Sequence, residues 1–259
     1  MLEATLQALR AKGRHLLVPY LMAGLDPDWL SYVDLVIERG ADAVEIGIPF
    51  SDPSMDGPVI QRAGEMALAR GVTPLSVLAE LGSRSFPVPL IVMTYYNIFH
   101  HMGEERAVRQ LRSAGVQGVI IPDLPLEEGG RWRDLATKEQ LDTVQLFSPA
   151  TPDERIDEIL AVAQGFVYGV GLMGVTGERA ELAATATTMA TRMRPRTSLP
   201  VLIGIGISSG DQAAAVIRAG ADGVVVGSAL LRRVLDNQSP QQIALFIDEL
   251  RGALDTTEP

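Results

Sequence analysis

Short apolar runs alternate with longer amphipathic segments along the whole chain of 259 residues. The runs are rich in Val, Ile and Leu and contain no regular polar alternation, which is typical of parallel strands buried on both faces. We therefore expect parallel strands separated by helices. The eight expected strands cover residues 16–21, 43–48, 90–95, 118–122, 143–147, 165–170, 201–205 and 223–226.

The segments between these runs carry helix start and stop signals. Proline precedes the helices expected at 28–39 and 153–163, and glycine follows those expected at 28–39, 104–114 and 211–219. Residues 1–13 form a further amphipathic segment before the first strand. Eight strands alternating with about eight helices in roughly 250 residues predict a closed (β/α)8 TIM barrel. We expect one α/β domain, 1–259, with an extra N-terminal helix; an open doubly wound sheet is the alternative.

Charge and composition exclude several classes of protein. The chain has 22 Lys and Arg against 32 Asp and Glu, a net charge of −10, so it lacks the basic face that a nucleic-acid binder needs. No apolar run approaches the roughly 20 residues that span a bilayer. The absence of cysteine excludes a disulfide framework and fits the cytoplasm.

Two loops rich in glycine and serine follow the seventh and eighth expected strands, at 204–211 and 226–231. In such barrels these loops commonly hold phosphate through backbone N–H groups and a helix N-terminus. Ser208 and Ser228 can cap the following helices or donate to phosphate oxygens. A third glycine loop, GVTG at 174–177, strengthens the prediction of a phosphate site. The glycine spacing is not the dinucleotide fingerprint, so we do not expect NAD.

Glu45 lies inside the second expected strand. A carboxylate in a buried strand is costly unless it is paired or functional, and an apolar surrounding would raise its pKa toward values that suit acid–base catalysis. A partnered structural glutamate is the alternative. The following loop, 49–58, carries Asp52 and Asp56, which composition alone does not separate from each other or from turn residues. Asp123 is expected to form a turn.

Other residues limit the chemistry. The two lysines, Lys12 and Lys138, lie away from the expected strand ends, which excludes a Schiff-base aldolase. His15, His100 and His101 are not arranged with carboxylates as metal ligands are, and the last two are expected in a solvated loop, so we expect no metal. Carboxylates alone can still cleave a C–C bond if the departing carbon accepts a proton, as C3 of indole does.

The segment VEIGIPFSDPSMDGPVIQ (44–61) strongly resembles the signature of tryptophan synthase α subunits. MTYYN (93–97), GVTG, GIGIS and GADGVVVGSA follow in the family's order, and the resemblance extends over essentially the whole chain. It implies cleavage of indole-3-glycerol phosphate into indole and glyceraldehyde 3-phosphate without a cofactor on this chain.

The resemblance also implies roles for individual residues. Glu45 would protonate C3 of indole and accept the glycerol hydroxyl proton, and Asp56 would bind the indole N–H. The other implied substrate-binding residues are Tyr20, Tyr95, Ile120, Phe147 and Tyr168 around the indole and Glu45, and Gly177, Gly206, Gly227 and Ser228 around the phosphate.

A partner is implied as well: a pyridoxal-phosphate β subunit in an α2β2 heterotetramer, with the 52–56 and 171–177 loops as coupled lids. Two departures from the common pattern concern lid closure and docking more than chemistry. Gly171-Leu172-Met173 precedes the GVTG motif where many members carry Ser-Arg, and Ile98 stands where proline is usual.

Four other functions differ from the one that the resemblance implies. The chain could be a free-standing lyase that releases indole without a partner, or a non-catalytic subunit that only activates one. Histidine-pathway sugar-phosphate isomerases use an Asp at strand one and another at strand five. The corresponding segments of this chain, LLVPYLM and TVQLF, contain no carboxylate. Indole-glycerol-phosphate synthase needs strand lysines, which are missing.

Overall fold

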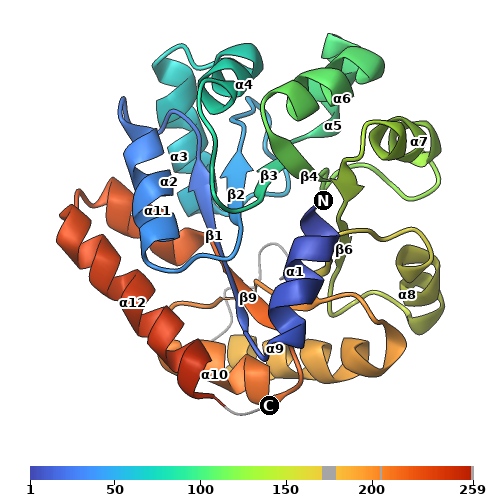
Figure 1. The fold of residues 1–259 in the computed structure, drawn as a ribbon, viewed down its shortest axis with the longest axis vertical. Helices are drawn as coiled ribbons and strands as arrows, with labels where there is room; N and C mark the ends of the chain where they lie inside the picture. The colour runs from blue at the N-terminus through green and yellow to red at the C-terminus, as the bar shows by residue number, and fades with distance from the viewer. Residues whose placement is uncertain (171–178, 205, 258–259) are drawn as a thin grey trace.

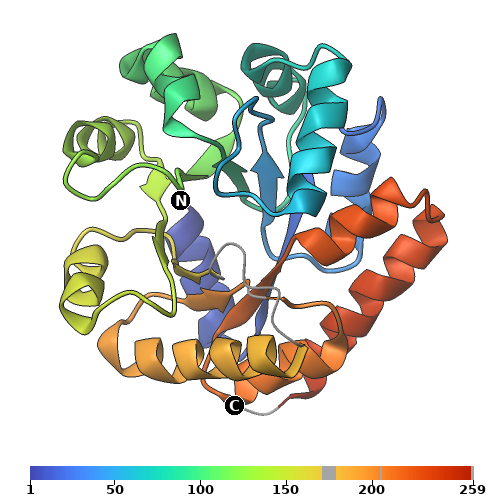
Figure 2. The same cartoon turned by 180° about the vertical axis from the view of Figure 1, so that it is seen from behind.

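The computed structural model describes residues 1–170, 179–204 and 206–257. In this part of the chain all paired strands are parallel, in the order β5-β4-β3-β2-β1-β9-β8-β7-β6, and helices surround them (Figures 1 and 2). The strands are β1 (Leu16–Met22), β2 (Val44–Gly47), β3 (Leu90–Met93), β4 (Val116–Ile120), β5 (Asp142–Thr143), β6 (Gln145–Phe147), β7 (Val167–Gly169), β8 (Val201–Ile203) and β9 (Gly223–Val226).

The two ends of this order, β5 and β6, are separated in the chain by Val144 alone. Together they occupy one strand position of the barrel: β5 pairs with β4, and β6 pairs with β7. Because one continuous stretch of chain binds both ends of the sheet, the sheet closes into a barrel. The predicted (β/α)8 TIM barrel is confirmed, and the predicted strand 143–147 is corrected to two short strands, because the chain changes its pairing partner at Val144.

Helices connect the strands and cover the outside of the barrel. Pro58, Pro74 and Pro240 stand in the first turns of their helices, and capping boxes begin α4 and α12. No helix of the described ranges is long and apolar enough to cross a membrane. The helices are α1 (Leu2–Ala11), α2 (Trp29–Glu38), α3 (Pro58–Ala69), α4 (Pro74–Gly82), α5 (Tyr96–Met102), α6 (Glu104–Ser113), α7 (Gly130–Lys138), α8 (Asp153–Leu160), α9 (Arg179–Met193), α10 (Gly210–Arg218), α11 (Ser228–Leu235) and α12 (Pro240–Thr256).

Two local predictions differ from the structure. His100 and His101 are exposed, as expected, but they lie in helix α5 rather than in a loop. Helix α8 ends at Leu160, three residues before the predicted end at 163, because the 161–163 segment turns back toward β7. The other three predicted helices agree within a residue with α2, α6 and α10.

Helix α1 is the extra N-terminal helix, and it lies across one mouth of the barrel (Figure 1). Leu2 and Leu6 are fully buried and belong to the same apolar cluster as barrel-interior residues such as Val18 and Phe166. The backbone N–H of Glu3 donates to Asp142 Oδ2 at 2.7 Å, which ties α1 to the start of β5. This mouth is filled, so a ligand must enter from the opposite mouth, where the strands end.

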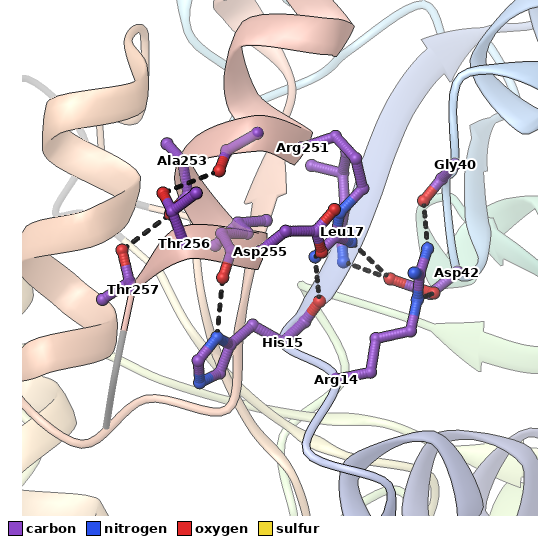
Figure 3. Close-up of polar contacts among 12 residues, drawn as sticks. Arg14, His15, Leu17, Gly40, Asp42, Arg251, Ala253, Asp255, Thr256 and Thr257 are labelled. Atoms are coloured by element: carbon purple, nitrogen blue, oxygen red, sulfur yellow. Dashed lines mark hydrogen bonds and ion pairs between the residues drawn. The ribbon is translucent and has the colours of Figure 1, made fainter.

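A polar cluster joins the last helix to the first two strands (Figure 3). Asp42, just before β2, accepts from Arg14, from the backbone N–H of Leu17 at 2.9 Å and from Arg251 at 3.0 Å. Arg251 also donates to the backbone oxygen of His15 at 2.8 Å and pairs with Asp255 at 2.7 Å. This cluster fixes α12 to the strand starts, at the end of the barrel away from the candidate site.

Candidate active site

Glu45 lies in β2, in register with Tyr20 on β1 and Ile91 on β3. Its side chain is fully buried, and neither carboxyl oxygen has a hydrogen-bond partner among the described residues. Burial, and secondarily the charge of Asp56, raises the pKa of Glu45 to about 8. The carboxyl group is therefore mostly protonated at neutral pH and can act as an acid.

Two buried tyrosines lie beside Glu45, one on β1 and one on β7. Burial raises the pKa of Tyr20 and of Tyr168, and the nearby charge of Glu45 adds to both shifts. Inward-facing glycines make room for their rings: a side chain at Gly47 would collide with Tyr20, and one at Gly204 would begin 2.6 Å from Tyr168 Cε2. Both rings are buried beside the fully buried Glu45 and contribute to its apolar surroundings.

Asp56 is brought next to this group by the loop that follows β2. It is mostly buried, and desolvation raises its pKa to about 6, while a hydrogen-bonding interaction with the Tyr95 hydroxyl acts in the opposite direction. Asp52, on the same loop, is exposed and accepts from the Ser51 hydroxyl at 2.6 Å. The structure thus separates the two aspartates that the sequence left equivalent.

The Asp56 loop also forms one wall of a narrow cleft at the ends of β2 and β3. The Tyr95 hydroxyl accepts from the backbone N–H of Met55 at 2.8 Å, and the Tyr95 ring stacks on Phe50 with centroids 5.0 Å apart. The lining includes Tyr20, Ile48, Phe50, Asp56, Gln61, Thr94 and Tyr95.

The sequence analysis missed several residues of this cleft, among them Phe50, Gln61 and Thr94. Thr94 is buried, and its hydroxyl donates to the backbone oxygen of Ile48 at 3.0 Å, which joins the ends of β2 and β3. Gln61 donates to the backbone of the Asp56 loop. The available signal was their position in the sequence. Thr94 directly follows β3, Phe50 lies in the loop that carries Asp56, and Gln61 lies in the first turn of α3, just after that loop.

The remaining apolar candidates lie at the ends of β4 and β6. Ile120 packs in the barrel interior, in the same cluster as Tyr168. Phe147 is buried in the cluster that contains Met189 and Ile203, between the sheet and α9, whereas its neighbour Leu146 packs against the interior cluster. Alternation along a strand turns successive side chains to opposite faces, so the Phe147 ring lies on the outer face of the sheet toward α9 and not in the barrel interior.

The expected phosphate loops differ in how their helices begin. At α11 the N-cap is Gly227, no side chain caps the helix, and the N–H groups of Leu230 and Leu231 bond the Gly227 oxygen. The N–H groups of Ser228 and Ala229 therefore have no acceptor in the described part of the chain. Ser228 is exposed, so a ligand oxygen can reach this helix start.

Helix α10 is already capped from within the protein. Its cap is Ser209, which accepts from Gln212, and the carboxylate of Glu249 accepts from the Gly210 N–H at 2.8 Å. Ser208, which the sequence offered as a cap, instead donates through its hydroxyl to Gln212 Oε1 at 3.0 Å. That prediction is corrected: the next serine has the extended backbone that a cap requires.

The other glycines of the predicted phosphate site are placed only in part. Gly206 is exposed and has a φ of 62°, a conformation that glycine adopts without strain. Gly177, the GVTG motif and the Gly171-Leu172-Met173 departure lie outside the described residues. Within the described ranges, no group of acidic and histidine side chains could hold a metal ion.

Comparisons with known proteins agree with one another. The family described as "Tryptophan synthase alpha chain" matches residues 6–253. A relative with that name from Chloroflexus aurantiacus is 45% identical over 260 residues, which covers 96% of this chain and 97% of that protein. One from Synechococcus sp. (strain CC9902) is 42% identical over 257 residues, covering 96% and 95%.

Solved structures extend the similarity to three dimensions. A chain in a structure of Mycobacterium tuberculosis tryptophan synthase superposes with a TM-score of 0.89 at 34% identity, covering 98% of this chain and 97% of that chain. A chain from Aquifex aeolicus VF5 gives a TM-score of 0.87 at 33% identity, covering 97% and 98%.

Proposed function

The chain belongs to the tryptophan synthase alpha chain family, and we propose that Glu45 and Asp56 carry out its reaction. The alpha chain is the lyase subunit that cleaves indole-3-glycerol phosphate into indole and glyceraldehyde 3-phosphate in tryptophan biosynthesis. The observation that carries the assignment of residues is the pair of neighbouring carboxyl groups with raised but different pKa values.

Glu45 acts as the acid and then as the base. Its carboxyl group gives a proton to C3 of the indole ring, which makes the ring a leaving group. The resulting carboxylate then takes the proton of the glycerol hydroxyl on the adjacent carbon as the C–C bond breaks and that carbon becomes an aldehyde. A pKa of about 8 supports both steps, because the group is protonated before the reaction and is a strong base once ionised.

Asp56 stabilises the positive charge that protonation places on the indole ring. With a pKa of about 6 it is mostly ionised at pH 7, and its carboxylate accepts a hydrogen bond from the indole N–H. Two carboxyl groups held in different protonation states can divide the roles of acid and charge stabiliser.

The remaining site residues bind substrate. Tyr20, Tyr95, Ile120 and Tyr168 surround the indole, and Tyr168 also lies beside Glu45. The Phe147 ring, expected from the sequence to join them, packs toward α9 instead. Gly177, Gly206, Gly227 and Ser228 hold the phosphate. The unoccupied N–H groups at the start of α11 support this binding mode, because a protein with a net charge of −10 must hold an anion by local dipoles.

The chain works with a tryptophan synthase β subunit in an α2β2 heterotetramer. Its own reaction needs acid, base and charge stabilisation alone, so we assign no cofactor to this subunit and place pyridoxal phosphate in the partner. We place the enzyme in the cytoplasm, in keeping with a sequence that has no cysteine. We treat 1–259 as one domain, since a single sheet runs from β1 to β9 and α12 is tied back to the starts of β1 and β2.

Indole release from indole-3-glycerol phosphate, measured with and without a β subunit, tests these assignments. Glu45→Gln should lower the rate by about 10²- to 10⁴-fold, and Asp56→Asn should lower it substantially. Asp52→Asn, assayed on the chain alone, is the matched control on the same loop. If Glu45→Gln left the activity of the complex unchanged, the chain would be a non-catalytic activator. Strong release by the chain alone would instead identify a free-standing lyase.

A further inference from the structure

Two side chains from outside the Asp56 loop hold its last residues. The side-chain amide of Gln61 donates to the backbone oxygen of Asp56 at 2.8 Å and approaches that of Pro53 at 3.4 Å. From the other side, the Tyr95 hydroxyl accepts from the Met55 N–H. The loop therefore lies between the first turns of α3 and the end of β3.

Gln61 is well placed for this contact. Helix α3 begins at Pro58 with Gly57 as its N-cap, and the backbone N–H of Gln61 bonds the Gly57 oxygen at 2.9 Å. Gln61 thus belongs to a fixed helical turn, and its side chain is half-buried at the cleft wall. The side-chain amide nitrogen of Gln61 donates to two backbone oxygens of the loop, so the contact requires a side chain with two N–H groups.

The contact restricts Asp56 in particular. Its backbone N–H bonds the Pro53 oxygen at 3.2 Å, and its backbone oxygen accepts from Gln61. Because both backbone polar groups of Asp56 are hydrogen-bonded, its backbone is held in place, and this sets the direction in which its side chain points. Apart from these contacts the segment has little support of its own: Asp52, Ser54 and Met55 are exposed.

We propose that Gln61 is a positioning residue for the cleavage reaction, which holds the Asp56 carboxylate beside Glu45 and Tyr95. This proposal rests on the role of Asp56 proposed above. Gln61 acts through the Asp56 backbone and touches no reacting atom. Positioning of this kind is catalytically significant, because a misplacement of about 1 Å can cost about 100-fold in rate.

Gln61→Leu keeps the approximate volume and removes both donors. We expect kcat/KM for indole-3-glycerol phosphate to fall by roughly tenfold to 100-fold, with most of the loss in kcat. Gln61→Glu should be at least as impaired, because its carboxylate would face two carbonyl oxygens. The matched control is Gln241→Leu, the same substitution at an exposed site in α12, which should leave kcat/KM within twofold of wild type.

A double-variant comparison separates positioning from general damage. If Gln61 acts through Asp56, adding Gln61→Leu to Asp56→Asn should lower the rate by less than twofold further, since the group to be positioned is already lost. A full additional loss in the double variant would overturn the proposal.

A second measurement is independent of activity. Carbon-13 NMR of labelled aspartate carboxyl groups gives the pKa of Asp56, which should fall from about 6 toward the ordinary value in Gln61→Leu, as the released loop exposes the side chain to water. An unchanged Asp56 pKa would overturn the proposal even if the rate fell. An active Asp56→Asn variant would instead overturn the catalytic role of Asp56, while the NMR result would still decide whether Gln61 positions it.

Discussion

The ring of Tyr20 fills the space in which a side chain at Gly47 would have to begin. Tyr20 on β1 is the register partner of Glu45 on β2, and Gly47 is the next residue of β2 that faces the barrel interior. The missing side chain at Gly47 thus allows a buried aromatic ring to lie near both Glu45 and Asp56. Burial of Glu45 depends on this arrangement.

Gly47→Ala should lower the free energy of unfolding by about 1–3 kcal/mol, the usual cost of overpacking a core, and should reduce kcat by displacing Tyr20. Urea unfolding and indole release measure the two effects. Gly252→Ala is the matched control: nothing lies within 4 Å of the added methyl group in helix α12, and alanine there should be neutral or stabilising by up to about 1 kcal/mol. Equal stability of the two variants would show that Tyr20 moves aside without cost.

Glu45→Gln should stabilise the folded protein, and increasingly so as pH rises. The carboxyl group has a pKa of about 8 when folded and about 4.5 when unfolded, so between these values the folded state binds more protons and wild-type stability falls with pH. Glutamine does not titrate and removes this loss, worth about 1.4 kcal/mol for each unit of pKa difference. Urea unfolding of wild type and Glu45→Gln at pH 5 and pH 8 measures how the difference in stability changes with pH. A stability difference that stays constant with pH would contradict the raised pKa.

The pH profile of kcat/KM should be bell-shaped. Activity requires Asp56 ionised and Glu45 protonated, so it should rise with an apparent pKa near 6 and fall with one near 8. The profile is measured on the purified chain with a β subunit present. In the Asp56→Asn variant the residual rate should lose the acidic limb and keep the alkaline one; the reverse result would exchange the two assignments.

Tyr95→Phe should move the acidic limb of this profile to higher pH. The hydroxyl of Tyr95 lowers the pKa of Asp56 against the effect of burial, so its removal raises that pKa further. The Met55 N–H also loses its acceptor. Gln61→Leu is expected to lower the pKa of Asp56, whereas Tyr95→Phe is expected to raise it. The sign of the change in this pKa therefore distinguishes the two loop contacts.

Asp42→Asn should destabilise the protein without changing its chemistry. It removes the carboxylate that binds Arg14 and Arg251 and leaves the largely buried Arg251 without its Asp42 partner, a loss of roughly 3–5 kcal/mol. Because the cluster in Figure 3 lies at the strand starts, kcat should be unchanged wherever the variant is folded. Urea unfolding and kcat at low temperature check both parts, and a change in kcat would show that α12 affects the site.

Much of the fold was predictable from local pattern. Apolar runs without polar alternation identify parallel strands, and proline and glycine mark the helix ends, because these signals depend on neighbouring residues alone. The exceptions involve distant contacts. The break at Val144 exists because β5 pairs with β4 and β6 with β7, and a strand's partners are not written in its own sequence.

The candidate site divides in the same way. Glu45 could be singled out because a charged residue within a buried strand is anomalous whatever surrounds it. Asp56 could not be separated from Asp52 by composition, and the functional contacts of Gln61 could not be read at all. Of the two serine-bearing loops, only the structure distinguishes the open helix start at Ser228 from the one that Glu249 occupies.

The sequence by itself therefore determined the barrel, the family and the buried carboxylate, since hydrophobic period, turn residues and the cost of a buried charge are local properties. Tertiary structure alone decided which aspartate meets Glu45, how far their pKa values move, and which N–H groups remain open to an anion. These quantities depend on desolvation and on distances between segments far apart in the chain, and they exist only once the barrel has closed.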